Sequence, residues 1–155
     1  MTWHPKQTVV VPIDFSGSTK KALETAVECA FGVSNVHVVH VVWAIDPPPP
    51  TGTWNADDIA VRRQMATQKA KQLLQQYGMS DAEIIVMQGD PGTRIVEYAE
   101  QVNADLIVIP SHGYSGLKRV LLGSTAERVI RHASCPVYVL RRDNENKENQ
   151  NAVDT

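Results

Sequence analysis

The feature that most constrains this chain is the alternation of short apolar runs with longer amphipathic segments. Five runs are rich in Val, Ile and other apolar residues and carry no helical stripe, which is typical of strands covered on both faces. They occupy residues 8–13, 36–43, 83–88, 105–110 and 136–140. Between them, apolar residues recur at helical spacing in four segments. This alternation predicts an α/β fold with a doubly wound, five-stranded parallel sheet.

The first helical segment shows how turn residues delimit the elements. Ser16 or Ser18 is a suitable N-cap, and the stripe that follows runs from Ala22 to Phe31. Gly32 comes directly after this stripe, where a glycine commonly ends a helix. We therefore expect the helix to end at Gly32 with Phe31 on its buried face.

The later helices carry their own start signals. Asn55 precedes the second, and Asp90 followed by Pro91 precedes the third, with proline in its preferred first position. Ser124 and Glu127 have the spacing of a capping box, which predicts that the last helix is capped by the Ser124 side chain.

Composition excludes several classes of protein. The chain has 155 residues, enough for one domain, which we place at 1–140, followed by a polar and disordered tail at 141–155. Its 15 Lys and Arg against 17 Asp and Glu give a net charge of -2, which does not favour nucleic acid or membranes as partners. The amino terminus is too polar for a signal peptide, so we expect a cytoplasmic location. The two cysteines, Cys29 and Cys135, have neither disulfide-framework nor metal-site spacing.

The predicted sheet gives a location for a ligand. In an open, Rossmann-like or flavodoxin-like sandwich, ligands bind at the carboxyl ends of strands, where the strand order reverses. If the first strand is central, the expected order is 3-2-1-4-5, and Asp14 and Ser111 face one crevice. Asp14 is suited to a ribose hydroxyl or a cation. The alternative is that its carboxylate only caps the turn through neighbouring backbone N–H groups.

A second candidate site is the glycine-containing stretch 111–124. Glycines allow a backbone to approach phosphates, and the helix that starts at Gly123 and Ser124 directs free N–H groups toward an anion. The alternative is an ordinary loop followed by a capped helix. Neither the P-loop pattern nor G-x-G-x-x-G occurs in the sequence.

The histidines do not indicate a metal site. His37 and His40 are three residues apart in one strand, so their side chains lie on opposite faces of the sheet. His112 lies in the glycine-containing stretch and is suited to a contact with phosphate, and the alternative is an ordinary solvated side chain of a polar loop. Cys135 has no basic neighbour in sequence, which favours an inert thiol.

Four stretches carry a wider pattern. They are VPIDFS at 11–16, HVV at 40–42, DLIVI at 105–109 and LLGSTAERVI at 121–130. HASCPV at 132–137 extends the pattern into the last strand. From about Thr8 to Leu140, the chain resembles the universal stress protein family.

The resemblance implies an adenine-nucleotide site. ATP-binding members of that family carry G-x2-G-x9-G-[ST], and this chain has Gly113, nine residues, then Gly123 and Ser124. Pro110 stands at the first glycine, which removes one potential N–H donor from the pocket wall. The implied ligand is ATP or a related adenine nucleotide, and an accompanying Mg²⁺ is left open. The residues implied to bind it are Pro12, Asp14 and Val41 near the adenosine, and Ser111, His112, Gly113, Gly123, Ser124 and Thr125 around the phosphates.

The implied function is that of a small cytoplasmic protein of stress response or signalling. No catalytic or metal-ligating residue is assigned, so we do not expect a dedicated enzyme, although slow ATP hydrolysis stays open. The resemblance also implies a homodimer formed by the last strand, Val137–Leu140, and it names no protein partner. The alternative is a nucleotide-free dimeric interaction module of the same family, which Pro110 favours.

Overall fold

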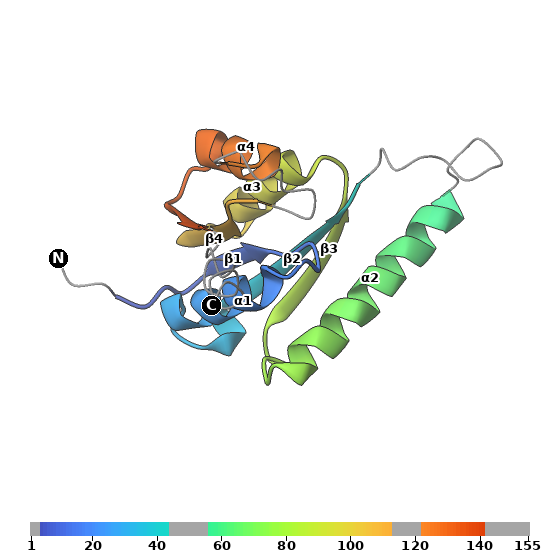
Figure 1. The fold of residues 1–155 in the computed structure, drawn as a ribbon, viewed down its shortest axis with the longest axis horizontal. Coiled ribbons are helices and arrows are strands. Elements are labelled where there is room, and N and C mark those ends of the chain that lie inside the picture. The colour runs from blue at the N-terminus through green and yellow to red at the C-terminus, as the bar shows by residue number, and fades with distance from the viewer. Residues whose placement is uncertain (1–3, 44–55, 113–121, 142–155) are drawn as a thin grey trace, which may run out of the picture.

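A five-stranded, all-parallel sheet forms the centre of the computed structural model, which describes residues 4–43, 56–112 and 122–141. Its strand order is β3-β2-β1-β4-β5, so the predicted fold and order are confirmed (Figure 1). Each strand lies within one residue of its predicted bounds. The strands are β1 Val9–Pro12, β2 Val36–Val42, β3 Glu83–Gln88, β4 Leu106–Pro110 and β5 Val137–Leu140.

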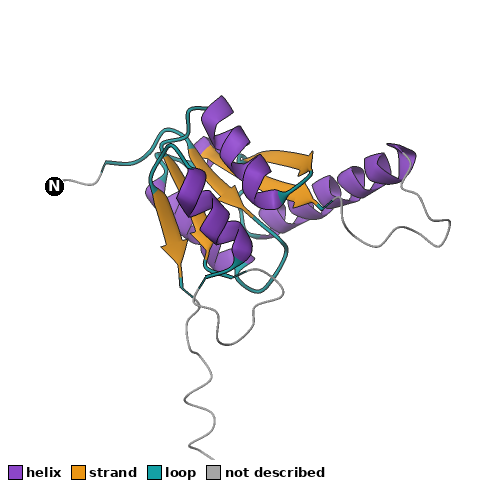
Figure 2. Cartoon of the chain, turned by 90° about the horizontal axis from the view of Figure 1, so that it is seen from above, coloured by secondary structure: helices purple, strands orange, loops and turns teal. Residues whose placement is uncertain are grey.

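Four α-helices cover the two faces of this sheet. Two of them, α1 and α2, lie on one face and the other two, α3 and α4, on the opposite face (Figures 1 and 2). The long helix α2 extends beyond the sheet in both views. The helices are α1 Thr19–Cys29, α2 Ala56–Gln76, α3 Pro91–Gln101 and α4 Ser124–His132, with a short 3-10 turn at Val33–Asn35.

Two hydrophobic cores, one on each face, follow from the alternation of side chains along the strands. Val9 and Val11 of β1 pack with α1 and α2, while Val10 between them packs with α3 and α4. All three are fully buried. Burying one such side chain stabilises a fold by roughly 1.5–3 kcal/mol, so the central strand holds both layers together.

The seam between β1 and β4 is closed at its amino end by a carboxylate. Oδ2 of Asp105 accepts hydrogen bonds from the backbone N–H groups of Gln7 and Thr8, both at 3.0 Å. The Asp105 N–H in turn donates to the Thr8 carbonyl at 2.9 Å. These bonds hold the starts of the two strands together before the regular ladder begins.

At its carboxyl end the same seam is open. The paired positions of β1 and β4 end with Val10 and Ile107. On their outer sides, β1 stays paired with β2 as far as Pro12, and β4 stays paired with β5 as far as Pro110. The two central strands therefore separate while each remains held by its other neighbour.

Two prolines account for this separation. In a parallel sheet, alternate residues direct both their N–H and C=O toward the same neighbouring strand. The Ile13 N–H donates to β2 at 2.8 Å, so Pro12 faces β4. The Ser111 N–H donates to β5 at 2.7 Å, so Pro110 faces β1. Each of the next two bonds of the ladder would need the N–H of one of these prolines, and proline has none.

The first helix departs from its prediction. It ends at Cys29 rather than at Gly32, and the Phe31 side chain is 71% exposed instead of buried. The reason is a bond outside the helix: the chain at Ala30 forms a parallel bridge with Lys6, and the Phe31 N–H donates to the Lys6 carbonyl at 2.9 Å. Pairing with the amino-terminal segment draws the chain out of the helical path.

The capping of the helices was predicted correctly only in part. The capping box of α4 is wrong, because Gly123 is the N-cap and Ser124 is already helical. Glu127 Oε1 accepts from Arg131 at 2.8 Å instead of reaching back to the cap. Ser18 occupies the N-cap of α1 but makes no side-chain cap bond. The predicted cap Asn55 lies outside the described residues.

The cap of α3 is confirmed. Asp90 Oδ1 accepts from the Thr93 N–H at 2.9 Å and from the Thr93 hydroxyl at 2.8 Å, and Pro91 follows at the first helical position. These two hydrogen bonds are the main reason that the pKa of Asp90 lies below its usual value, and Arg128 adds to the effect.

We expect Asp90→Ala to lower the free energy of unfolding by about 1 kcal/mol, because it removes the side-chain acceptor at the start of α3. Since the folded carboxyl group has a lowered pKa, this contribution is present above the unfolded pKa and is lost as the pH falls through the folded one. Urea denaturation at neutral and acidic pH measures both effects. Asp90→Asn, which keeps a capping oxygen, should lose less, and equal losses for the two variants would contradict this role.

Candidate functional site

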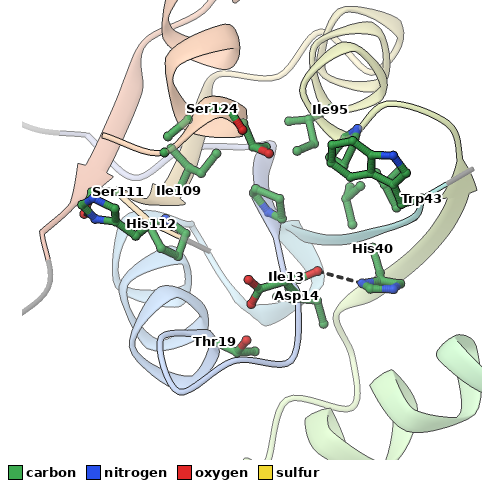
Figure 3. A pocket seen from close by; sticks show the side chains of 18 of the residues that line it. Ile13, Asp14, Thr19, His40, Trp43, Ile95, Ile109, Ser111, His112 and Ser124 are labelled. Atoms are coloured by element: carbon green, nitrogen blue, oxygen red, sulfur yellow. Dashed lines mark hydrogen bonds between the residues drawn. The ribbon is translucent and has the colours of Figure 1, made fainter. Parts of the chain in front are cut away.

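A cavity of about 450 Å³ opens where β1 and β4 separate. It lies at the carboxyl ends of the central strands and is lined from β1, β2, β4 and the starts of α1, α3 and α4. In Figure 3, Trp43 and Ile95 lie on one side of it and Ser111 and His112 on the other, with Asp14 and Thr19 below. Its volume is within the range of small-molecule pockets, roughly 300–1,000 Å³.

The turn after β1 presents Asp14 to this cavity. Oδ1 of Asp14 accepts the Ser16 N–H at 2.9 Å, so the carboxylate also braces its own turn. Phe15, between them, has a φ of 61°, a left-handed conformation that is uncommon for an aromatic residue. The two hypotheses for Asp14 therefore do not exclude each other, because one carboxylate oxygen caps the turn while the side chain also lines the cavity.

His40 supports this turn from β2. Its Nδ1 lies 2.8 Å from the Ile13 carbonyl oxygen (Figure 3). The Phe15 ring packs against the His40 imidazole with centroids 4.7 Å apart. Lys69 of α2 places its Nζ 4.5 Å from the centroid of the same Phe15 ring. Because a carbonyl can only accept, the hydrogen bond requires the proton on Nδ1 of His40.

Burial lowers the pKa of His40, and the charge of Lys69 adds to the decrease. The hydrogen bond to Ile13 and the charge of Asp14 act in the opposite direction but do not outweigh burial. The imidazole is therefore mainly uncharged at neutral pH, with Nδ1 as its donor.

The opposite side of the cavity is held by Ser111. Its backbone N–H donates to β5, and its carbonyl accepts from the Gly123 N–H at 2.6 Å. Its hydroxyl lies 3.0 Å from Nδ1 of His112, and the residue as a whole is only 4% exposed. One buried serine thus joins the end of β4 to the residue that begins α4.

The first turn of α4 lines the cavity through Ser124, Thr125 and Ala126. Its N-cap is a glycine, which has no side chain to accept from the first N–H groups, and no side-chain cap bond is formed. A helix start of this kind attracts an anion through its N–H groups and its dipole. Glu127, in the same turn, is paired with Arg131.

The remaining wall of the cavity is apolar. Val41 and Trp43 follow each other on the side of β2 that faces α3, and Ile95 of α3 and Ile109 of β4 complete this wall. Trp43 is partly exposed at the rim. The cavity therefore combines an apolar wall suited to a planar ring with a polar side suited to an anion.

The structure brings the predicted site residues together. Eight of the nine line this one cavity, and the ninth, Gly113, lies outside the described residues. Four further lining residues were not predicted from the sequence: Thr19, His40, Trp43 and Ile95. Thr19 is 4% exposed, and its hydroxyl has no hydrogen-bond partner among the described residues. The start of a helix after Asp14 was the available signal for Thr19, whereas Ile95 belongs to a helix that only the tertiary structure brings to the crevice.

His37, the other histidine of β2, lies on the opposite face of the sheet from His40, as predicted, and does not line the cavity. Nδ1 of His37 is 2.8 Å from the Tyr98 hydroxyl, and its Nε2 is 3.6 Å from a Glu83 carboxylate oxygen. Burial, together with the charge of Glu83, raises the pKa of Tyr98 to about 12.

Within the described ranges, no group of three or more His, Cys, Asp and Glu side chains is placed to hold a metal ion. Burial also raises the pKa of the Cys135 thiol.

Comparison with known proteins identifies the family. The family model described as "Universal stress protein family" matches residues 6–141. The chain belongs to the universal stress protein family. Universal stress protein MJ0531 of Methanocaldococcus jannaschii is 35% identical over 140 residues, which cover 86% of this chain and 81% of that protein.

Two solved structures relate this universal stress protein to known folds. That of the hypothetical protein MJ0577 matches with a TM-score of 0.75 and 26% identity, over 89% of this chain and 97% of the other. A universal stress protein in complex with cAMP matches with a TM-score of 0.58 and 26% identity, over 90% and 100% of the two chains. In the described part of this chain, no helix is long and apolar enough to cross a bilayer.

The buried state of His40 predicts a pH dependence of stability. Because the folded protein disfavours the charged imidazole, the unfolded chain binds the proton more tightly, and the free energy of unfolding should fall as the pH drops below about 6.5. His40→Asn keeps a donor for the Ile13 carbonyl but does not titrate. Denaturation at about pH 7.5 and about pH 5.5 should therefore show a smaller loss of stability in the variant than in the wild type. Equal losses would show that His40 is not the responsible group.

Proposed function

We propose that this universal stress protein binds ATP or a related adenine nucleotide in the cavity between β1 and β4 and acts in stress response or signalling. The observation that carries the proposal is the meeting of an uncapped helix start, at Gly123 and Ser124, with an apolar wall in one cavity. The relative in complex with cAMP supports the choice of an adenine ligand.

In this proposal, the two sides of the cavity bind different parts of the ligand. Val41 and Pro12 pack against the adenosine, and Asp14 accepts from a ribose hydroxyl. The phosphates lie against Gly123, Ser124 and Thr125, at the N–H groups that begin α4, with Ser111 and His112 beside them. Gly113, which the family resemblance adds to this set, lies outside the described residues. If Mg²⁺ accompanies the nucleotide, Asp14 is the carboxylate of the described lining that can approach it.

The proposed role is binding rather than dedicated catalysis. Nδ1 of His40 is committed to the Ile13 carbonyl and Nδ1 of His112 lies against the Ser111 hydroxyl, so neither of these nitrogens is placed to activate a water. Slow hydrolysis of bound ATP is compatible with this role. The free thiols of Cys29 and Cys135 are in keeping with the proposed cytoplasmic location.

Purified protein should bind ATP in isothermal titration calorimetry, and Gly123→Val should weaken that binding by at least about tenfold, equivalent to about 1.4 kcal/mol. Gly123 has a φ of -74°, which any residue can adopt, so the substitution tests the space at the helix start rather than backbone strain.

Gly17→Val provides the matched control. Gly17 lies outside the cavity lining, and a Cβ placed on it meets no atom within 4 Å, so its ATP affinity should equal that of the wild type. Undetectable binding of ATP and other adenine nucleotides by the wild-type protein would overturn the proposed function. Wild-type affinity in Gly123→Val would remove the start of α4 from the site.

The proposal includes a homodimer formed through β5, the edge strand next to β4. The carbonyls of Pro136 and Leu140 accept from β4, so the backbone of Val139, between them, faces the open edge. An edge strand exposes unpaired N–H and C=O groups, and a second copy can cover them around a two-fold axis. Tyr138 is 45% exposed and adds an aromatic side chain to this edge.

Val139→Pro tests this interface, because it removes an N–H that faces the edge without removing a bond to β4. The mass measured by light scattering should fall to that of a single chain. Since the Val139 side chain packs against the α3 and α4 core, Val139→Ala is the control for lost packing, and it should remain a dimer. A dimer of unchanged strength in Val139→Pro would contradict the β5 interface.

A second candidate function is that of a nucleotide-free dimeric interaction module. The observation that favours it is Pro110, which lines the cavity and has no N–H to offer a ligand. The titration with ATP described above distinguishes the two candidates.

A further inference from the structure

The wall of the cavity between β1 and β4 is unusual in its hydrogen-bonding groups. Pro12 and Pro110 both line the cavity, and the bonds made by their neighbours turn both of them toward the gap between the two strands. A strand residue directs its C=O to the same side as its nitrogen. These two positions therefore offer carbonyl oxygens to the gap and no N–H.

The carboxylate of Asp14 adds to the same chemistry. It lines the cavity two residues after Pro12, and it is an acceptor when ionised. A phosphoryl oxygen placed against these three groups would meet two carbonyl oxygens and a carboxylate, all of which are acceptors. A hydroxyl or amino group would instead find acceptors for its hydrogen, so the wall has the opposite preference from the start of α4.

We propose that Pro110 is a specificity-determining residue: it makes this wall accept a hydrogen-bond donor of the ligand and reject a phosphoryl oxygen. The inference rests on the proposed adenine-nucleotide site and adds which part of the ligand each wall takes. Ribose hydroxyls lie toward Pro12 and Asp14, and because Pro110 offers the phosphates no donor, they are bound only from the side of Ser124. The ratio of ATP affinity to adenosine affinity is accordingly lower in this pocket than in a pocket with an N–H donor at position 110.

The test restores the missing N–H. In Pro110→Gly and Pro110→Ala, calorimetry should show ATP binding strengthened by about tenfold, the size expected for one added hydrogen bond to a charged group. Adenosine, which has no phosphate, should keep its affinity within about twofold. The alanine variant shows whether the N–H itself is responsible, since alanine restores the donor without the conformational freedom of glycine. Pro136→Ala, at a proline outside the cavity lining, should leave both affinities unchanged.

The outcomes separate this inference from the proposed function. A raised ratio of ATP to adenosine affinity in both variants supports the inference, and so does ATP binding that appears only once the N–H is restored. An unchanged ratio in variants that bind both compounds overturns the inference and leaves the proposed function standing. Absence of binding of either compound to the wild type and to both folded variants overturns both. Circular dichroism establishes that the variants are folded.

Discussion

The seam of hydrogen bonds between β1 and β4 is the constraint on which the rest of the structure depends. Asp105 holds the two strands together at one end, and two prolines prevent their ladder from continuing at the other. Each strand keeps its outer neighbour, so the sheet opens locally without coming apart. The cavity therefore results from the two backbone positions, Pro12 and Pro110, that have no N–H. The lining side chains surround an opening that the separation of the two strands creates.

Around this opening, the fold supplies unlike groups from elements that are distant in sequence. The turn at Asp14 is braced from β2 by His40, and the start of α4 is tied to the end of β4 by Ser111. Both supports are hydrogen bonds to backbone atoms, so the positions of the ligand-facing groups depend little on flexible side chains. The apolar wall near Ile95 comes from the helix layer of one face, which links the site to the core beneath it.

Much of this was predictable from sequence because it follows from local pattern. Apolar runs located the strands to within a residue, and proline after Asp90 located a helix start. Two of the errors share one cause, which is that a tertiary hydrogen bond outweighs local propensity. Phe31 is exposed because its chain pairs with Lys6, and Ser124 is helical because Gly123 is held by Ser111. The crevice itself was predictable from strand order, whereas the residues that α3 contributes to it required the packed structure.

The bond between the Gly123 N–H and the Ser111 carbonyl has a wider consequence. Ser111 directly follows β4 and Gly123 is the N-cap of α4, so this 2.6 Å contact fixes the end of the strand against the start of the helix. Because it joins two backbone atoms, this contact does not depend on the chemistry of the side chains at the two positions. The distance from β4 to the helix start that lines the cavity is thus set by the main chain, so a substitution of a lining side chain can alter ligand preference while this spacing stays the same.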